Sequence, residues 1–141
     1  MKIMVSASQL GENCKYSGGN NRDENVLRFI DGHEVIPVCP EVMGGLPTPR
    51  PPAEIIHGEV INREGKSVDE QYRRGAQMAL EIAQREKIDL AILQSRSPSC
   101  GVKEIYDGTF SGKRIHGQGV TARLLSEHGF KLIDREELKT E

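Results

Sequence analysis

Residues 88–101 read IDLAILQSRSPSCG. The first six are apolar except for Asp89, and a run of this length and composition is typical of a parallel strand that is covered on both faces. The small polar residues that follow cannot continue a core strand, so the chain is expected to leave the sheet before Cys100. This stretch therefore predicts a buried strand with a cysteine-bearing loop at its carboxyl end.

Strands and helices alternate on both sides of this stretch. Strands are expected at residues 2–7, 34–38 and 130–133, helices at 22–31, 67–87 and 120–128, and a turn or hairpin at 106–113. Ser67 and Glu70 form a capping-box pattern, and Pro37 indicates a sheet edge or a strand end. The alternation predicts one domain over residues 1–141, an α/β, Rossmann-like fold with a mainly parallel open sheet flanked by helices and ligands at the carboxyl ends of the strands.

The composition narrows the class of protein. The 141 residues carry a net charge of −2 and are 36% hydrophobic, which indicates neither a disordered chain nor a general nucleic-acid-binding surface. No apolar run approaches the length of a membrane span, and the start of the chain does not resemble a signal peptide, so we expect a cytoplasmic protein. Glycine and proline cluster at 11–19, 44–52 and 108–119, which we expect to be loops, and 135–141 is expected to be a solvated, frayed end.

Three cysteines are present, and they cannot all pair with one another. Cys39 follows the strand at 34–38 and Cys100 follows the strand at 88–93, while a third polar loop, 6–11, leaves the first strand at the same edge of the sheet. Thiols converging from separate loops can hold a soft metal or an iron–sulfur cluster, can include a nucleophile, or can be inert. The spacing alone does not decide among these three.

Three long blocks carry a resemblance to a known family. They are VSASQLGENCKYSGG at 5–19, PVCPEVMGGLPTPR at 37–50 and SRSPSCG at 95–101, with GQGVTA at 117–122. Together they resemble the signature of the thiouracil desulfurase-like family, formerly known only as a domain of unknown function. The resemblance implies a 4Fe-4S cluster held by three cysteines, with one open iron that takes sulfur from a thiolated pyrimidine while water or hydroxide replaces it, without redox change.

The resemblance also implies roles for individual residues. Cys39 and Cys100 would be cluster ligands, Glu41 the general acid or base, and Ser97 and Ser99 would position the ring or the attacking water. The expected substrate-binding residues are Ser8, Gly44, Gly45, Arg50 and Arg96, of which the two arginines would hold a phosphate if the substrate is a nucleotide.

The chain departs from the family at the first block. The family usually has cysteine and leucine where this chain has Ser8 and Gln9, and that cysteine is the expected third ligand. A hydroxyl is a harder and far less acidic ligand than a thiol. Three explanations remain open: Cys14 completes the cluster, Ser8 removes a ligand, or the protein has lost the cluster.

The leading hypothesis is therefore an iron–sulfur-dependent desulfurase. A second is a non-catalytic module that binds a small nucleotide or sulfur species and has lost its cluster, and a third is a cysteine-nucleophile hydrolase or transferase. The charge balance favours a small thiolated pyrimidine base or nucleotide over thiolated tRNA. The sequence leaves the oligomeric state open.

Overall fold

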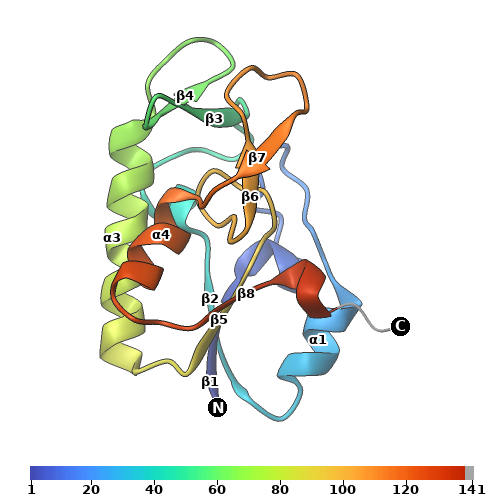
Figure 1. Ribbon diagram of the computed structural model, residues 1–141. Coiled ribbons are helices and arrows are strands. Elements are labelled where there is room, and N and C mark those ends of the chain that lie inside the picture. The colour runs from blue at the N-terminus through green and yellow to red at the C-terminus, as the bar shows by residue number, and fades with distance from the viewer. Residues whose placement is uncertain (139–141) are drawn as a thin grey trace.

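A computed structural model describes residues 1–138 and shows a four-stranded parallel sheet with the strand order β2-β1-β5-β8 (Figure 1). The strands are β1 (Lys2–Ser6), β2 (Glu34–Val38), β5 (Leu90–Leu93) and β8 (Leu132–Asp134). In this sheet Ile3 pairs with Val35 on one side and with Leu90 on the other. The predicted α/β fold with an open parallel sheet is confirmed, and β2, which contains Pro37, is an edge strand.

Helices cover both faces of the sheet because side chains alternate along its strands. Met4, Ala91 and Leu93 pack on one face with α3 (Asp69–Glu86) and α4 (Val120–Glu127). On the other face the neighbouring residues of the same strands pack with α1 (Glu24–Ile30). All of β5 is buried, as the apolar run at 88–93 predicts. None of the helices within residues 1–138 is long and apolar enough to cross a membrane.

The capping box expected at Ser67 and Glu70 is wrong. The residue that precedes α3 is Val68, and no side chain caps this helix end. The Ser67 hydroxyl instead donates a hydrogen bond to Glu59 Oε2 at 2.6 Å. The same hydroxyl oxygen accepts a hydrogen bond from the N–H of Asp69 at 3.5 Å. Because α3 begins at Asp69, Ser67 stands one residue before the N-cap position, and the capping box does not form.

Two hairpins lie beyond the carboxyl ends of the sheet strands, at the end of the molecule away from the N-terminus (Figure 1). The hairpin of β3 (Ala53–Ile56) and β4 (Glu59–Asn62) turns at His57 and Gly58, whose φ angles of 49° and 79° suit a tight turn. This hairpin was not predicted. The hairpin at 106–113 is confirmed, and it is formed by β6 (Glu104–Tyr106) and β7 (Arg114–His116), so part of the loop expected at 108–119 is a strand.

Short helical turns follow several strands. They are η1 (Ala7–Leu10) after β1, α2 (Pro40–Met43) after β2 and η2 (Arg135–Leu138) after β8. The frayed end expected at 135–141 is therefore wrong for Arg135–Leu138, where Arg135 also bonds Asp23 across the sheet edge at 3.2 Å. Residues 139–141 lie outside the described part of the chain.

Candidate functional site

One cavity of about 600 Å³ opens at the carboxyl ends of β1, β2 and β5. Cys14, Cys39 and Cys100 line this cavity, and each arrives from a loop that follows a different one of these strands. The predicted site residues on its wall are Ser8, Cys14, Cys39, Glu41, Arg50, Arg96, Ser97, Ser99 and Cys100. The sheet edge indicated by the sequence is thus the place where these side chains meet.

Cys39 stands at the junction of β2 and α2. It is the residue before the first turn of α2, and Pro40 at the first helical position starts that turn. Its Sγ lies 3.6 Å from the carbonyl oxygen of Cys14. A hydrogen bond from the Cys14 thiol lowers the pKa of Cys39 to about 7.

Cys14 is the thiol that the loop after η1 brings to Cys39. Its contact with Cys39, together with burial, raises the pKa of Cys14 well above the ordinary value for a thiol. Ser8 also lies on the cavity wall, where its Oγ accepts a hydrogen bond from Asn21 at 3.4 Å. Gln9 is fully buried and donates from Nε2 to the carbonyl oxygen of Ile92 at 3.0 Å. Of the two candidates for a third ligand, Cys14 is therefore the one in contact with another cysteine.

Cys100 is held in a turn built by Ser97. The Ser97 hydroxyl oxygen accepts hydrogen bonds from the backbone N–H groups of Ser99 and Cys100, both at 3.0 Å. The Cys100 side chain is buried, and this burial raises the pKa of its thiol to about 12.

The turn that carries Cys100 is fixed to the start of α4. The N–H of Val120 donates to the carbonyl oxygen of Pro98 at 2.8 Å, and the N–H of Thr121 donates to Ser99 at 2.8 Å. A side chain at Gly119 would collide with Ser99, since its Cβ would lie 2.5 Å from the Ser99 carbonyl oxygen. Gly119 therefore approaches the backbone of the turn, and the helix start positions Cys100.

Ser99 is 1% exposed, and its hydroxyl shares a 2.7 Å hydrogen bond with the hydroxyl of Thr121. The thiol of Cys100 lies 3.8 Å from the same Ser99 oxygen. Ser99 thus lies deep in the cavity wall. Ser97 differs, because its hydroxyl oxygen accepts both hydrogen bonds of the turn and its hydroxyl proton remains available to a ligand.

Glu41 projects from α2 and pairs with Arg50. Arg50 Nε donates to Glu41 Oε2 at 2.9 Å, and the two side chains are only 4% and 13% exposed. Tyr72 of α3 also lines the cavity beside them, and burial together with the Glu41 carboxylate raises the pKa of Tyr72. Tyr72 lies within the helix expected at 67–87, and the sequence did not indicate its place at the site.

Gly44 and Gly45 lie outside the set of residues that line this cavity. Gly44 instead packs α2 against α3, where an added Cβ would lie 1.9 Å from the carbonyl oxygen of Gln71. Gly75 makes the reciprocal approach to Pro40 from α3. The sequence predicted that a ligand approaches these glycines closely. In the structure, α3 makes the close approach to Gly44 instead.

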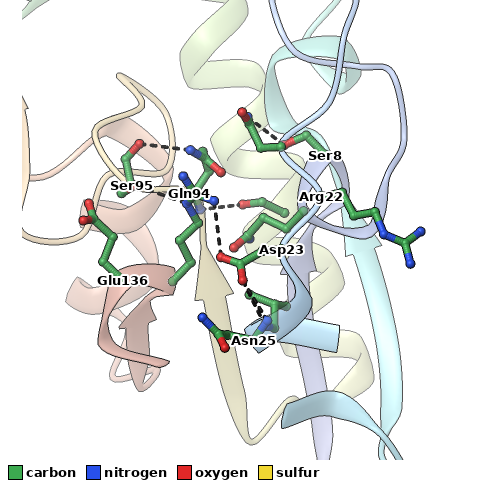
Figure 2. Close-up of polar contacts among 12 residues, drawn as sticks. Ser8, Arg22, Asp23, Asn25, Gln94, Ser95 and Glu136 are labelled. Carbon is green, nitrogen blue, oxygen red and sulfur yellow. Dashed lines mark hydrogen bonds and ion pairs between the residues drawn. The ribbon is translucent and has the colours of Figure 1, made fainter. Parts of the chain in front are cut away.

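Arg96 lies at the edge of the cavity with a left-handed backbone, at φ 61°. Its guanidinium forms an ion pair with Glu136. Figure 2 shows Gln94 and Ser95 next to each other, with Asp23 on one side of the pair and Glu136 on the other. Arg135 links the loop after β5 to the start of α1, because it donates to Ser95 Oγ at 3.4 Å and to Asp23 Oδ2 at 3.2 Å.

Both hairpins contribute to the cavity mouth. Arg63 lies 5.7 Å from the centroid of the Phe110 ring, and both residues line the cavity. Glu54 Oε1 ties the hairpins together by accepting from the N–H groups of Gly108 and Phe110 at 2.9 and 3.1 Å. The sequence did not indicate these residues because it predicted no element at 53–62, where β3 and β4 form.

The chain matches a known family over nearly its full length. A family model described as 2-thiouracil desulfurase matches residues 3–137. The chain belongs to the 2-thiouracil desulfurase family. The uncharacterized protein YbbK of Bacillus subtilis (strain 168) is 40% identical over 146 residues, which cover 96% of this chain and 97% of YbbK.

A solved structure of the family is similar in both fold and sequence. It is the 4Fe-4S-dependent thiouracil desulfidase TudS, with a TM-score of 0.91 and 40% identity, covering 97% of this chain and 92% of TudS. The resemblance stated from the three sequence blocks is confirmed. The family is thus a desulfurase family, and the dependence on a 4Fe-4S cluster is a property of TudS.

The donor set of the cavity fits such a cluster. No three His, Cys, Asp or Glu side chains within residues 1–138 are grouped closely enough to hold a single metal ion. A 4Fe-4S cluster is larger than an ion, and its thiolate ligands bind separate irons, so they surround a volume instead of meeting at one atom. Three thiols on the wall of one cavity satisfy that requirement.

Proposed function

We propose that this protein is a 4Fe-4S-dependent desulfurase that replaces the sulfur of a thiolated pyrimidine with oxygen from water. The observation that carries the proposal is the meeting of Cys14, Cys39 and Cys100 on one cavity wall with Glu41 and Ser97. Membership of the 2-thiouracil desulfurase family and similarity to TudS support it.

Cys14, Cys39 and Cys100 would hold the cluster. Cys14 is preferred over Ser8 because it brings a third sulfur to the cavity wall and because a thiolate is the softer ligand for iron. The low pKa of Cys39, about 7, favours the deprotonated form that a ligand needs. When bound, the cluster supplies an iron coordination position soft enough to take up the sulfur that leaves the ring.

Glu41 would act as the general base. It would remove a proton from water as the water oxygen bonds to the ring carbon and the carbon–sulfur bond breaks. Arg50 and Tyr72 hold this carboxylate in place, and it would take the proton of a water bound in the cavity. The net reaction converts a thiocarbonyl and water into a carbonyl and hydrogen sulfide, with no change in electron count.

Ser97 would orient the substrate or the water through its free hydroxyl proton. Ser99 would support the turn through Thr121 and could contact the ligand only from the depth of the wall. Ser8 and Arg96 would contribute polar groups around the ring. A base or a small nucleotide suits a cavity of about 600 Å³, and the net charge of −2 speaks against tRNA as the substrate.

The test is turnover by the anaerobically reconstituted protein. Formation of uracil from 2-thiouracil and from 4-thiouracil is followed by chromatography, together with the release of sulfide. We expect stoichiometric uracil and sulfide from at least one of the two substrates. Tight binding of the thiolated ring without turnover, by wild type and by Ser8→Cys, would instead support the non-catalytic binding module that has lost its cluster.

A further inference from the structure

The Arg50 side chain lies inside the cavity wall with only 4% of its surface exposed. Its guanidinium makes hydrogen bonds to four different residues. The acceptors are Glu41 Oε2 from both Nε and Nη2, the Cys14 carbonyl from Nη2 at 2.9 Å, and the Pro47 carbonyl and Thr48 Oγ1 from Nη1 at 3.2 and 3.1 Å.

These bonds use the whole donor capacity of the residue. A guanidinium carries five N–H groups in a rigid plane, and five hydrogen bonds are made. A substrate phosphate would have to displace one of these acceptors in a buried setting, which costs the full desolvation of the group left unpaired. The geometry therefore points away from substrate binding by Arg50 and toward a role inside the wall.

We propose that Arg50 is a positioning residue that holds Cys14 and Glu41 on the same wall of the cavity. The inference rests on the proposed roles of these two residues. Glu41 is carried by α2 and Cys14 by the loop after η1, and the guanidinium of Arg50 joins the two segments directly. Without it, the Cys14 carbonyl oxygen loses its bond to a charged donor and keeps only the weaker contact with the Cys39 thiol at the start of α2.

Arginine is required because the side chain makes five hydrogen bonds to four residues at once. Lysine can pair with Glu41, but its ammonium carries only three N–H groups on one atom and cannot hold all four residues together as the planar guanidinium does. The backbone N–H of Arg50 also donates to the carbonyl oxygen of Tyr16 at 2.8 Å, and this bond survives any substitution except proline. We therefore expect the variants to fold, with a Cys14 loop that opens more often but keeps its backbone bond to Arg50.

The experiment compares wild type, Arg50→Met, Arg50→Lys and the control Arg74→Met. Arg74 also joins a carboxylate to a backbone carbonyl next to α2, through Glu70 and Gly44, but its side chain is 53% exposed and lies outside the residues that line the cavity. Two quantities are measured: hydrogen exchange of the amides in residues 11–19 of the cluster-free chain, and iron bound per chain after anaerobic reconstitution. Thermal unfolding and exchange in α4 report on global stability.

We expect Arg50→Met and Arg50→Lys to accelerate exchange in residues 11–19 by about tenfold, the effect of losing one charge-assisted hydrogen bond, with exchange in α4 unchanged. Both should bind less iron than wild type, and Arg74→Met should match wild type in both quantities. A wild-type exchange rate in Arg50→Met would overturn the proposal. A wild-type rate in Arg50→Lys would also overturn it, because a positive charge near Glu41 would then be sufficient. If wild type itself binds no iron, the proposed function fails, and the exchange data still decide the role of Arg50.

Discussion

The thiol of Cys39 lies 3.6 Å from the carbonyl oxygen of Cys14, although 25 positions separate the two residues in the sequence. Their thiols also share a hydrogen bond, which lowers the pKa of Cys39 and raises that of Cys14. Cys100 on the same wall has its pKa raised by burial. The cluster-free protein therefore has one acidic thiol and two weakly acidic ones.

This asymmetry predicts selective alkylation of Cys39 in the cluster-free protein. The reactive thiolate of Cys39 forms as the pH rises through about 7, whereas the thiolate of Cys100 requires a pH near 12. Iodoacetamide labelling followed by peptide mass spectrometry, across pH values from about 6 to 9, should show Cys39 labelled first. Cys14→Ala removes the donated bond and should slow labelling of Cys39 at neutral pH. Equal rates at Cys39 and Cys100 would contradict the prediction.

Replacement of the proposed base should slow the reaction without removing the cluster. Glu41→Gln keeps the shape of the side chain but cannot take a proton, so kcat should fall on the order of 10²- to 10⁴-fold. Iron content should remain close to that of wild type. Glu81→Gln, on an exposed position of α3, is the matched control and should keep full activity. A Glu41→Gln enzyme with wild-type kcat would exclude Glu41 as the base.

The packing of α2 against α3 predicts a stability effect at Gly44. A Cβ at this position would overlap the Gln71 carbonyl oxygen, so Gly44→Ala must push α2 away from α3. We expect a loss of about 1–3 kcal/mol in the free energy of unfolding, measured by urea denaturation. Gly19→Ala, whose Cβ would meet only ordinary contacts at 3.5 Å, should change stability much less. Equal effects of the two substitutions would show that the helix contact is not tight.

The sheet was predictable because its strands and helices carry strong local signals. The run at 88–93 is buried on both faces, and the strand at 34–38 has the bounds that its β-branched residues indicate. The cap of α3 and the hairpin of β3 and β4 were not predictable in the same way. Ser67 bonds to Glu59 across space, and the hairpin turns at His57 and Gly58 without a run of alternating apolar residues long enough to indicate two strands.

The site was predictable only in part, for a related reason. Cys39 and Cys100 follow strands directly, so the sheet edge fixes their place once the fold is known. Cys14 belongs to a longer loop, and the bond from Arg50 to its carbonyl oxygen is a contact that no local pattern reveals. Arg50 and Gly44 illustrate the same limit: the sequence suggested contact with a ligand, and the structure gives each a close contact within the protein.

The identity of the third cluster ligand is the most direct test. Iron and acid-labile sulfide per chain should be measured in wild type, Cys14→Ser and Ser8→Cys after anaerobic reconstitution. We expect wild type to hold a 4Fe-4S cluster, Cys14→Ser to lose it, and Ser8→Cys to hold no more iron than wild type. A colourless wild type with a cluster-loaded Ser8→Cys, or full loading of Cys14→Ser, would contradict the assignment of Cys14 as the third ligand.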